Sequence, residues 1–137
     1  MSSGASSGFG SRREDRETAL GILYAAETQG RENLEVLNEQ PVEPESYVSD
    51  LIKGISSKQE EIDLLIERNA DEWRLERMPV VDRALLRLAV LELLNFPETS
   101  IATVINEAVE LAGEYSTENS KRFVNGLLSQ IADQVRS

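Results

Sequence analysis

Apolar residues recur along the chain at intervals of three and four positions, and glycine and proline are scarce after residue 11. This spacing places the apolar side chains on one face of an α-helix, and no stretch alternates long enough to indicate a β-strand. Scattered glycines and prolines mark where helices end. The pattern predicts helices over residues 12–28, around 34–37, and over 45–56, 57–70, 79–96, 101–115 and 116–135.

The segment from Pro79 to Phe96 is apolar on nearly every side, and Pro97 follows it directly. A helix that is apolar all round is packed by neighbours on most of its faces, so we expect this one at the centre of the fold. Ser57 and Glu60 match a capping box, which predicts that a new helix begins there.

Together these elements predict an all-α protein of about seven helices, in one domain over residues 12–137. Two prolines before residue 45 and a linker after Ala70 divide the domain into two helical subdomains. Residues 1–11 are mostly small and polar, and we expect a flexible tail there. They lack the basic start and apolar middle of a signal peptide.

The amino-acid composition excludes several kinds of catalytic and metal site. The chain of 137 residues contains neither cysteine nor histidine, which excludes disulfides, thiolate zinc sites and the commonest general base. We therefore expect no metal, no cofactor and no enzymatic activity. No apolar run approaches the roughly 18 residues that a membrane span requires, so we expect a cytoplasmic protein.

Charge is distributed unevenly along the chain. The formal net charge is −11, yet residues 12–16 and residues 117–137 each carry +1. Because these two ends together contribute +2, the stretch between them carries −13. Phosphate binding depends on the local density of cations. The composition therefore argues against a protein that coats nucleic acid with its whole surface.

Lys121, Arg122 and Phe123 lie side by side near the start of the last predicted helix. At about 100° per residue, Phe123 lies about 95° from the centre of the buried stripe, and Lys121 about 65° from it on the other flank. Arg122 points about 160° away and Asn119 about 135° away. The stripe itself consists of Val124, Leu127, Leu128, Ile131 and Val135.

Two interpretations of Phe123 follow from this edge position. In the first, which is the commoner arrangement, the ring completes the border of the core and the neighbouring cations are merely solvated. In the second, the ring, the cations and the amide of Asn119 form a platform for unpaired bases of single-stranded RNA. Spacing alone does not decide between them.

Gly126 lies in the interior of the same predicted helix, directly after Asn125. Glycine destabilises a helix interior relative to alanine, and Asn-Gly otherwise indicates a turn. We expect a close crossing with another helix that leaves no room for a side chain at Gly126.

Three stretches occur in the order "REDRETALGILYAAE", "WRLERMPVVDRALLRLAVLELL" and "INEAVELAGEYSTENSKRFVNGLL". In sequence and spacing they resemble the NusB family of bacterial transcription antitermination factors, over about residues 12–131. The most specific part is "INEAVELA" followed closely by "SKRFVNGLL". The resemblance implies seven helices in two subdomains and no catalysis.

The resemblance also implies binding of single-stranded boxA RNA from ribosomal-RNA leader transcripts. The family binds it together with NusE, a small-subunit ribosomal protein, in an antitermination complex on RNA polymerase. In the family, RNA is contacted by the starts of the first and last helices. The resemblance therefore implies RNA contacts here at Arg12, Arg13, Arg16, Asn119, Lys121, Arg122 and Phe123. The resemblance likewise implies that Tyr24, Glu76 and Asp82 belong to the surface that binds the partner protein. An acidic middle segment suits a basic ribosomal partner.

Glu14 and Asp15 interrupt the first arginines, where the family has a denser basic run. Because affinity scales with the number of phosphates neutralised, we predict weak RNA binding by the isolated chain and stronger binding with NusE. The alternative is a protein–protein adaptor that keeps the fold without binding RNA directly. The resemblance also leaves a homodimer open.

Overall fold

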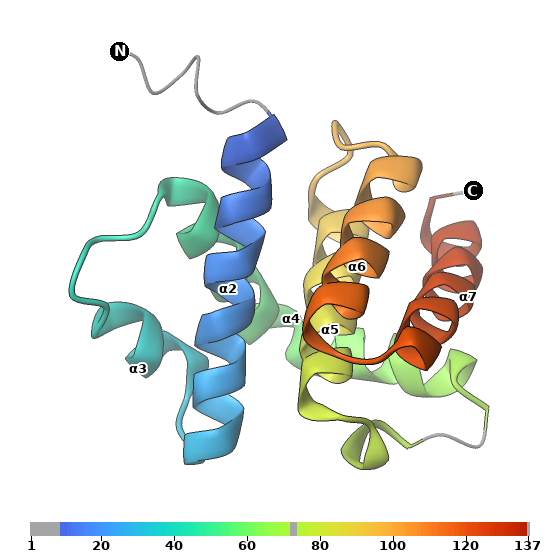
Figure 1. Cartoon of the computed structure of the whole chain (residues 1–137), viewed down its shortest axis with the longest axis horizontal. Helices are drawn as coiled ribbons and strands as arrows, with labels where there is room; N and C mark the ends of the chain where they lie inside the picture. The colour runs from blue at the N-terminus through green and yellow to red at the C-terminus, as the bar shows by residue number, and fades with distance from the viewer. Residues whose placement is uncertain (1–8, 72–73, 137) are drawn as a thin grey trace.

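The structure is a computed structural model that describes residues 9–71 and 74–136. In this part of the chain all regular secondary structure is helical, which confirms the predicted all-α class. None of the described helices combines the length and apolar character needed to cross a membrane. The elements in Figure 1 are α2 (Phe9–Gln29), α3 (Asn33–Asn38), α4 (Ser46–Asn69), the 3-10 helix η1 (Leu75–Arg77), α5 (Val80–Asn95), α6 (Ile101–Tyr115) and α7 (Glu118–Val135).

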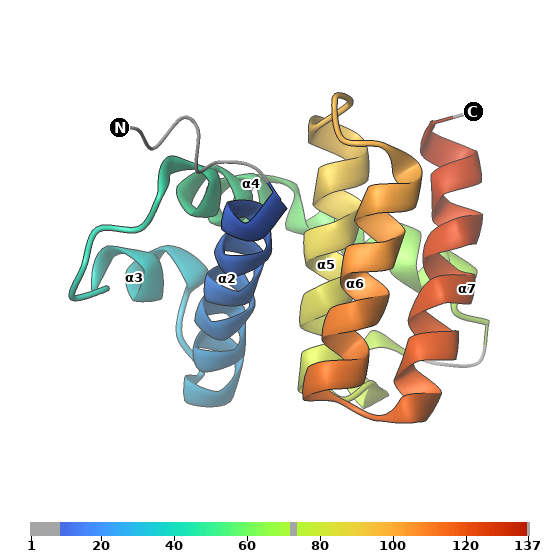
Figure 2. The same cartoon turned by 45° about the horizontal axis from the view of Figure 1, so that its top comes forward.

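Two groups of helices lie side by side and are joined by α4 (Figures 1 and 2). One group contains α2, α3 and the first part of α4, and the other contains α5, α6 and α7 packed alongside one another. The contacts of α5 extend to α2, α4, α6 and α7. Leu85, Leu86 and Leu91 on α5 are almost completely buried, which confirms the predicted central helix.

α4 joins two of the predicted helices, 45–56 and 57–70, into one element with a break at Lys58. The backbone of Lys58 has φ −117° and ψ 18°, outside the helical range. The capping-box pattern therefore indicated the right place, but the hydroxyl of Ser57 instead donates to the carbonyl of Gly54 at 3.3 Å. Lys58 Nζ donates to Asn95 Oδ1 at the end of α5, at 2.6 Å.

Local signals set the ends of the helices as expected. Gly30 has a positive φ of 65° after α2, and the amide of Arg31 donates back to the carbonyl of Ala26 at 2.9 Å, as in a glycine C-cap. α2 begins at Phe9, three residues before the predicted start. The first eight residues of the expected flexible tail lie outside the described residues.

The expected helix crossing at Gly126 is wrong. A Cβ placed on Gly126 would meet no neighbouring atom within 4 Å. The close approach occurs instead at Gly54 on α4, where a Cβ would lie 2.8 Å from Leu91 Cδ2 on α5. The absence of a side chain at Gly126 therefore has no packing reason within the described residues.

Candidate functional site

The start of α7 presents the predicted trio much as the helical angles indicated. Asn119 and Arg122 are exposed, while Phe123 is half-buried and packs against the core. Lys121 is half-buried too, because its aliphatic stem crosses α6 at Gly113, where an added Cβ would lie 2.8 Å from Lys121 Cδ. Lys121 thus covers α6 with its stem and leaves the outward side of α7 to Arg122.

Phe123 lines two grooves. The first lies between α7 and the entry to α5 and is also lined by Met78, Pro79, Asp82, Thr117, Asn119 and Ser120. The second lies between α7 and the end of α4 and is also lined by Asn69, Ala70, Asp71, Arg122, Gly126, Leu127 and Gln130. The ring of Phe123 therefore packs against the core, as in the first interpretation, and also borders open surface, which the second interpretation requires.

Asp82 is the residue that fixes the start of α7 against α5. It is only 3% exposed, and its two carboxylate oxygens accept hydrogen bonds from Ser116 Oγ at 2.7 Å and Ser120 Oγ at 2.8 Å. The hydroxyl of Thr117 caps α7 by accepting from the amide of Ser120 at 3.1 Å. We expected Asp82 to offer its carboxylate to a partner protein, but the carboxylate is buried and both of its oxygens are used within the chain. Its role here is to position the helix.

Arg16 lies in the interior rather than at the surface. It is 5% exposed and forms a forked pair with Glu92 of α5, with Nη2 to Oε2 at 2.8 Å and Nε to Oε1 at 3.0 Å. The hydroxyl of Tyr47 donates to the same carboxylate. Burial opposes the charge of Arg16, but the hydrogen bonds and negative charge of Glu92 outweigh it and raise the pKa of Arg16.

This pair corrects the expected RNA contact at Arg16, because the guanidinium would have to abandon Glu92 to reach a phosphate. Burial raises the pKa of Tyr47, so the phenol keeps the proton that it donates. Neither Glu92 nor Tyr47 was among the predicted functional residues. One signal was available: a lone carboxylate in the apolar run "VLELL" requires a buried partner.

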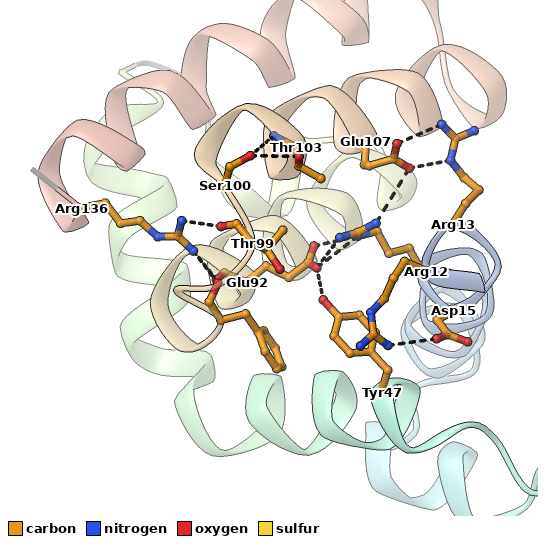
Figure 3. A network of polar contacts seen from close by, with 12 residues as sticks. Arg12, Arg13, Asp15, Tyr47, Glu92, Thr99, Ser100, Thr103, Glu107 and Arg136 are labelled. Atoms are coloured by element: carbon orange, nitrogen blue, oxygen red, sulfur yellow. Dashed lines mark hydrogen bonds and ion pairs between the residues drawn. The ribbon is translucent and has the colours of Figure 1, made fainter. Parts of the chain in front are cut away.

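Arg12 and Arg13 are also engaged within the molecule (Figure 3). The guanidinium carbon of Arg12 lies 3.7 Å from the ring centroid of Tyr47, and its Nη1 lies 3.5 Å from Asp15. Arg13 Nε donates to Glu107 Oε1 of α6 at 2.6 Å. The hydrogen bond from Arg13 lowers the pKa of Glu107. Burial raises the pKa of Asp15.

Arg136, which with Lys121 and Arg122 makes up the cations of residues 117–137, caps the end of α5. Its guanidinium donates to four backbone carbonyls at 2.6–3.0 Å, those of Glu92, Leu93, Phe96 and Thr99. The basic character of the C-terminal segment therefore reduces to Lys121 and Arg122. Among the described residues, neither of these two forms an ion pair.

The two predicted RNA elements do not form one basic surface. α2 lies on one side of α5 and α6, and α7 lies on the other (Figures 1 and 2). Acidic residues of α2 and α6 also lie between the start of α2 and the start of α7. Glu110 lies 3.6 Å from Arg13, and Glu17 accepts a hydrogen bond from the hydroxyl of Tyr115 at 2.9 Å.

The predicted partner residue Tyr24 is 46% exposed. It lines a groove formed by α2, α5 and α6, together with Glu17, Leu20, Gly21, Val81 and Tyr115. Tyr115 is similarly exposed, at 48%. Glu76 is exposed on η1. This Tyr24 groove combines two exposed aromatic rings with a carboxylate, a composition that suits a protein interface.

The fold is that of an all-α protein built from two helical subdomains. The chain belongs to the NusB family, which residues 13–133 match. A transcription antitermination protein NusB of Salinispora tropica is 45% identical over 130 residues, covering 89% of this chain and 95% of that protein. The protein of the same name from Elusimicrobium minutum is 45% identical over 132 residues, covering 90% and 94%.

Solved structures agree with this assignment. The structure of T. maritima NusB has a TM-score of 0.81 and 37% identity, and the match covers 92% of this chain and 93% of that one. A crystal structure of the antitermination factors NusB and NusE in complex with dsRNA has a TM-score of 0.77 and 30% identity, covering 90% and 96%.

Proposed function

We propose that this protein is a transcription antitermination factor that binds single-stranded boxA RNA of ribosomal-RNA leaders together with NusE. It does so in an antitermination complex on RNA polymerase, and therefore in the cytoplasm. Its relatives support the proposal by name, and one similar structure holds NusB, NusE and RNA together.

The observation that carries the proposal is the surface around Phe123. An aromatic ring that borders two grooves offers unpaired bases a stacking partner, and the exposed guanidinium of Arg122 adjoins it in one groove. Asn119 adjoins it in the other and offers hydrogen bonds to base edges. We assign the RNA contacts to these three residues, with Lys121 adding positive charge nearby and the half-exposed Arg12 offering a separate cation at the start of α2.

The Tyr24 groove is the surface that we assign to NusE. It shares no lining residue with the two grooves around Phe123, although Val81 and Tyr115 lie within two positions of Asp82 and Thr117 of one of them. Glu17 in the groove and the exposed Glu76 suit a basic partner, and such charges increase the association rate and selectivity. Two exposed tyrosines supply the aromatic anchors that interfaces favour.

The test is the binding of a fluorescent boxA RNA to the chain alone and with NusE, over a series of salt concentrations. We expect weak binding alone and tighter binding with NusE, because Arg13 and Arg16 are occupied within the molecule. The double variant Arg122→Ala, Phe123→Ala should lose at least about tenfold in affinity, since stacking on one ring contributes about 1–3 kcal/mol. Equal binding by parent and double variant would refute the assignment.

Two controls sharpen this experiment. Lys53→Ala removes an exposed cation from α4, in the other subdomain, and should leave RNA affinity within about twofold because salt-dependent binding is local. A duplex of the same sequence tests the strandedness, since the similar complex contains dsRNA. Preference for the duplex would contradict stacking of unpaired bases on Phe123.

The ion pairs of α2 favour a second candidate, a NusB-like adaptor that binds protein partners without direct RNA contact. Arg13 and Arg16 are both paired with carboxylates, so the cations at the start of α2 are largely neutralised. NusE binding with no RNA affinity at any salt concentration, alone or in the complex, would establish the adaptor.

A further inference from the structure

Three of the glycines in the described residues have a structural reason. Gly30 adopts the positive φ that ends α2. Gly54 makes room for Leu91, and Gly113 makes room for the stem of Lys121, in each case with 2.8 Å between an added Cβ and the neighbouring side chain. Any side chain at these positions would require strain or repacking.

Gly126 has no such reason. An added Cβ would meet nothing within 4 Å, the residue is exposed, and α7 continues through it from Glu118 to Val135. Glycine in a helix interior is less stable than alanine. The free protein therefore gains nothing from Gly126 in packing or backbone geometry and loses helix stability. Gly21 on α2 is equally open, so the feature that sets Gly126 apart is its place in the groove beside Phe123, which points to a requirement outside the folded chain.

The position of Gly126 indicates what that requirement is. Phe123, Gly126 and Gln130 follow one another at helical spacing and line the same groove between α7 and the end of α4. Gly126 is thus a gap in a wall formed by a ring on one side and an amide on the other. Arg122 lines this groove as well, and so does Asp71.

We propose that Gly126 is a clearance position at which bound RNA approaches the backbone of α7. The proposal rests on the proposed function and extends it to a subsite. A nucleotide that stacks on Phe123 places its base or sugar over Gly126, where Gln130 reaches a base edge. Its phosphate lies toward Arg122, because Asp71 repels an anion on the opposite wall. A side chain at Gly126 would occupy the space of that nucleotide.

The experiment compares Gly126→Ala and Gly126→Gln in two measurements, thermal unfolding and binding of the fluorescent boxA RNA. Gly126→Ala should raise the Tm by about 3–5 °C, since it removes the glycine penalty in a helix. Gly126→Gln should weaken RNA binding by about tenfold or more, the loss expected when one stacked base is displaced. Gly126→Ala should show a smaller loss.

Matched variants separate the steric effect from general effects. Gly21→Ala changes the other helical glycine that has nothing within 4 Å, and it should raise the Tm similarly. Ser129→Gln places the same long side chain on an exposed position of α7 outside both grooves, and it should leave RNA affinity unchanged. Gly126→Gln should also leave the salt slope intact, whereas Arg122→Ala should reduce it by about one ion.

The outcomes distinguish this proposal from the proposed function. If the parent binds RNA and Phe123→Ala weakens it while Gly126→Gln does not, the clearance role is wrong and the proposed function stands. If Gly126→Gln weakens NusE binding instead of RNA binding, the groove is a protein site and the proposal is overturned. If the parent fails to bind RNA even with NusE, both proposals fail together.

Discussion

The starts of α2 and α7 carry similar charge in the sequence but differ in their surroundings. At the start of α2, Arg13 is paired with Glu107 of α6 and Arg16 with Glu92 of α5. At the start of α7, Arg122 is exposed beside the half-buried ring of Phe123. One set of arginines joins the two subdomains, and the other faces solvent next to open grooves.

This difference shows that a local charge count does not measure an available cation. The carboxylates that neutralise Arg13 and Arg16 come from residues more than seventy positions away in the sequence. Arg136 is used in the same way by backbone carbonyls. Only contacts between helices reveal which guanidinium groups remain for a ligand.

The largest effect is expected when one arginine from each region is replaced by alanine. Arg16→Ala leaves Glu92 as a buried charge without its cation, and such losses reduce the free energy of unfolding by about 3–5 kcal/mol. Arg122→Ala should change it by less than about 0.5 kcal/mol, as surface substitutions do. Urea unfolding of the three proteins measures both values.

A double variant checks the cause of that loss. Arg16→Ala together with Glu92→Ala removes both charges, so the combined loss should be smaller than the sum of the two single losses. Simple additivity would mean that the arginine and the carboxylate stabilise the fold independently. Similar losses for Arg16→Ala and Arg122→Ala would remove the contrast between the two regions.

A second prediction converts a paired arginine into an available one. Glu107→Gln removes the carboxylate that holds Arg13, so RNA affinity should rise by about two- to fivefold and the salt slope by about one ion. Fluorescence anisotropy across a salt series measures both quantities. Glu118→Gln, which removes an exposed carboxylate near Arg122, tests whether any loss of negative charge has the same effect.

The effect of Glu107→Gln should depend on Arg13. In a background of Arg13→Ala, Glu107→Gln should no longer raise the RNA affinity, since Arg16, the other arginine near Glu107, stays paired with Glu92. A rise of equal size in both backgrounds would show that Glu107 acts through the overall charge of the surface. Arg13 would then remain bound to α6 in the complex.

The all-α fold was predictable because periodicity and helix ends are local properties. α5 is central because it is apolar on nearly every side. Gly30 ends α2, and Thr117 caps the start of α7. Two of the predicted helices form one element, because α4 continues through the break at Lys58. Which helices join across a local signal depends on tertiary packing, and a capping pattern does not contain that information.

The candidate site was predictable only in its outward half. Angles on one helix correctly placed Asn119, Arg122 and Phe123, because these directions depend on α7 alone. Arg16 and Asp82 required partners on other helices, Glu92 for the first and Ser120 for the second. A family resemblance transfers residue positions, but it does not state which side chains are buried.

The smallest expected effect concerns acid, and it again separates the two regions. The hydrogen bond from Arg13 lowers the pKa of Glu107 below its ordinary value of 4.5. The stability from this pair is therefore complete above pH 4.5 and is lost as the pH falls further and the carboxylate takes up a proton. Glu107→Gln should accordingly reduce the free energy of unfolding by less than about 1 kcal/mol at pH 7.

Urea unfolding of parent and Glu107→Gln between pH 7 and pH 3 measures this difference, which should shrink toward zero at the acidic end. Comparing the two proteins cancels the opposite contribution of Asp15, whose pKa burial raises. Arg122→Ala, measured in parallel, should show a difference from the parent that does not change with pH, because Arg122 forms no ion pair with any of the described residues. A Glu107 difference that stays constant down to pH 3 would mean that the pair stabilises the fold through packing, and that Arg13 is held at α6 by something other than charge.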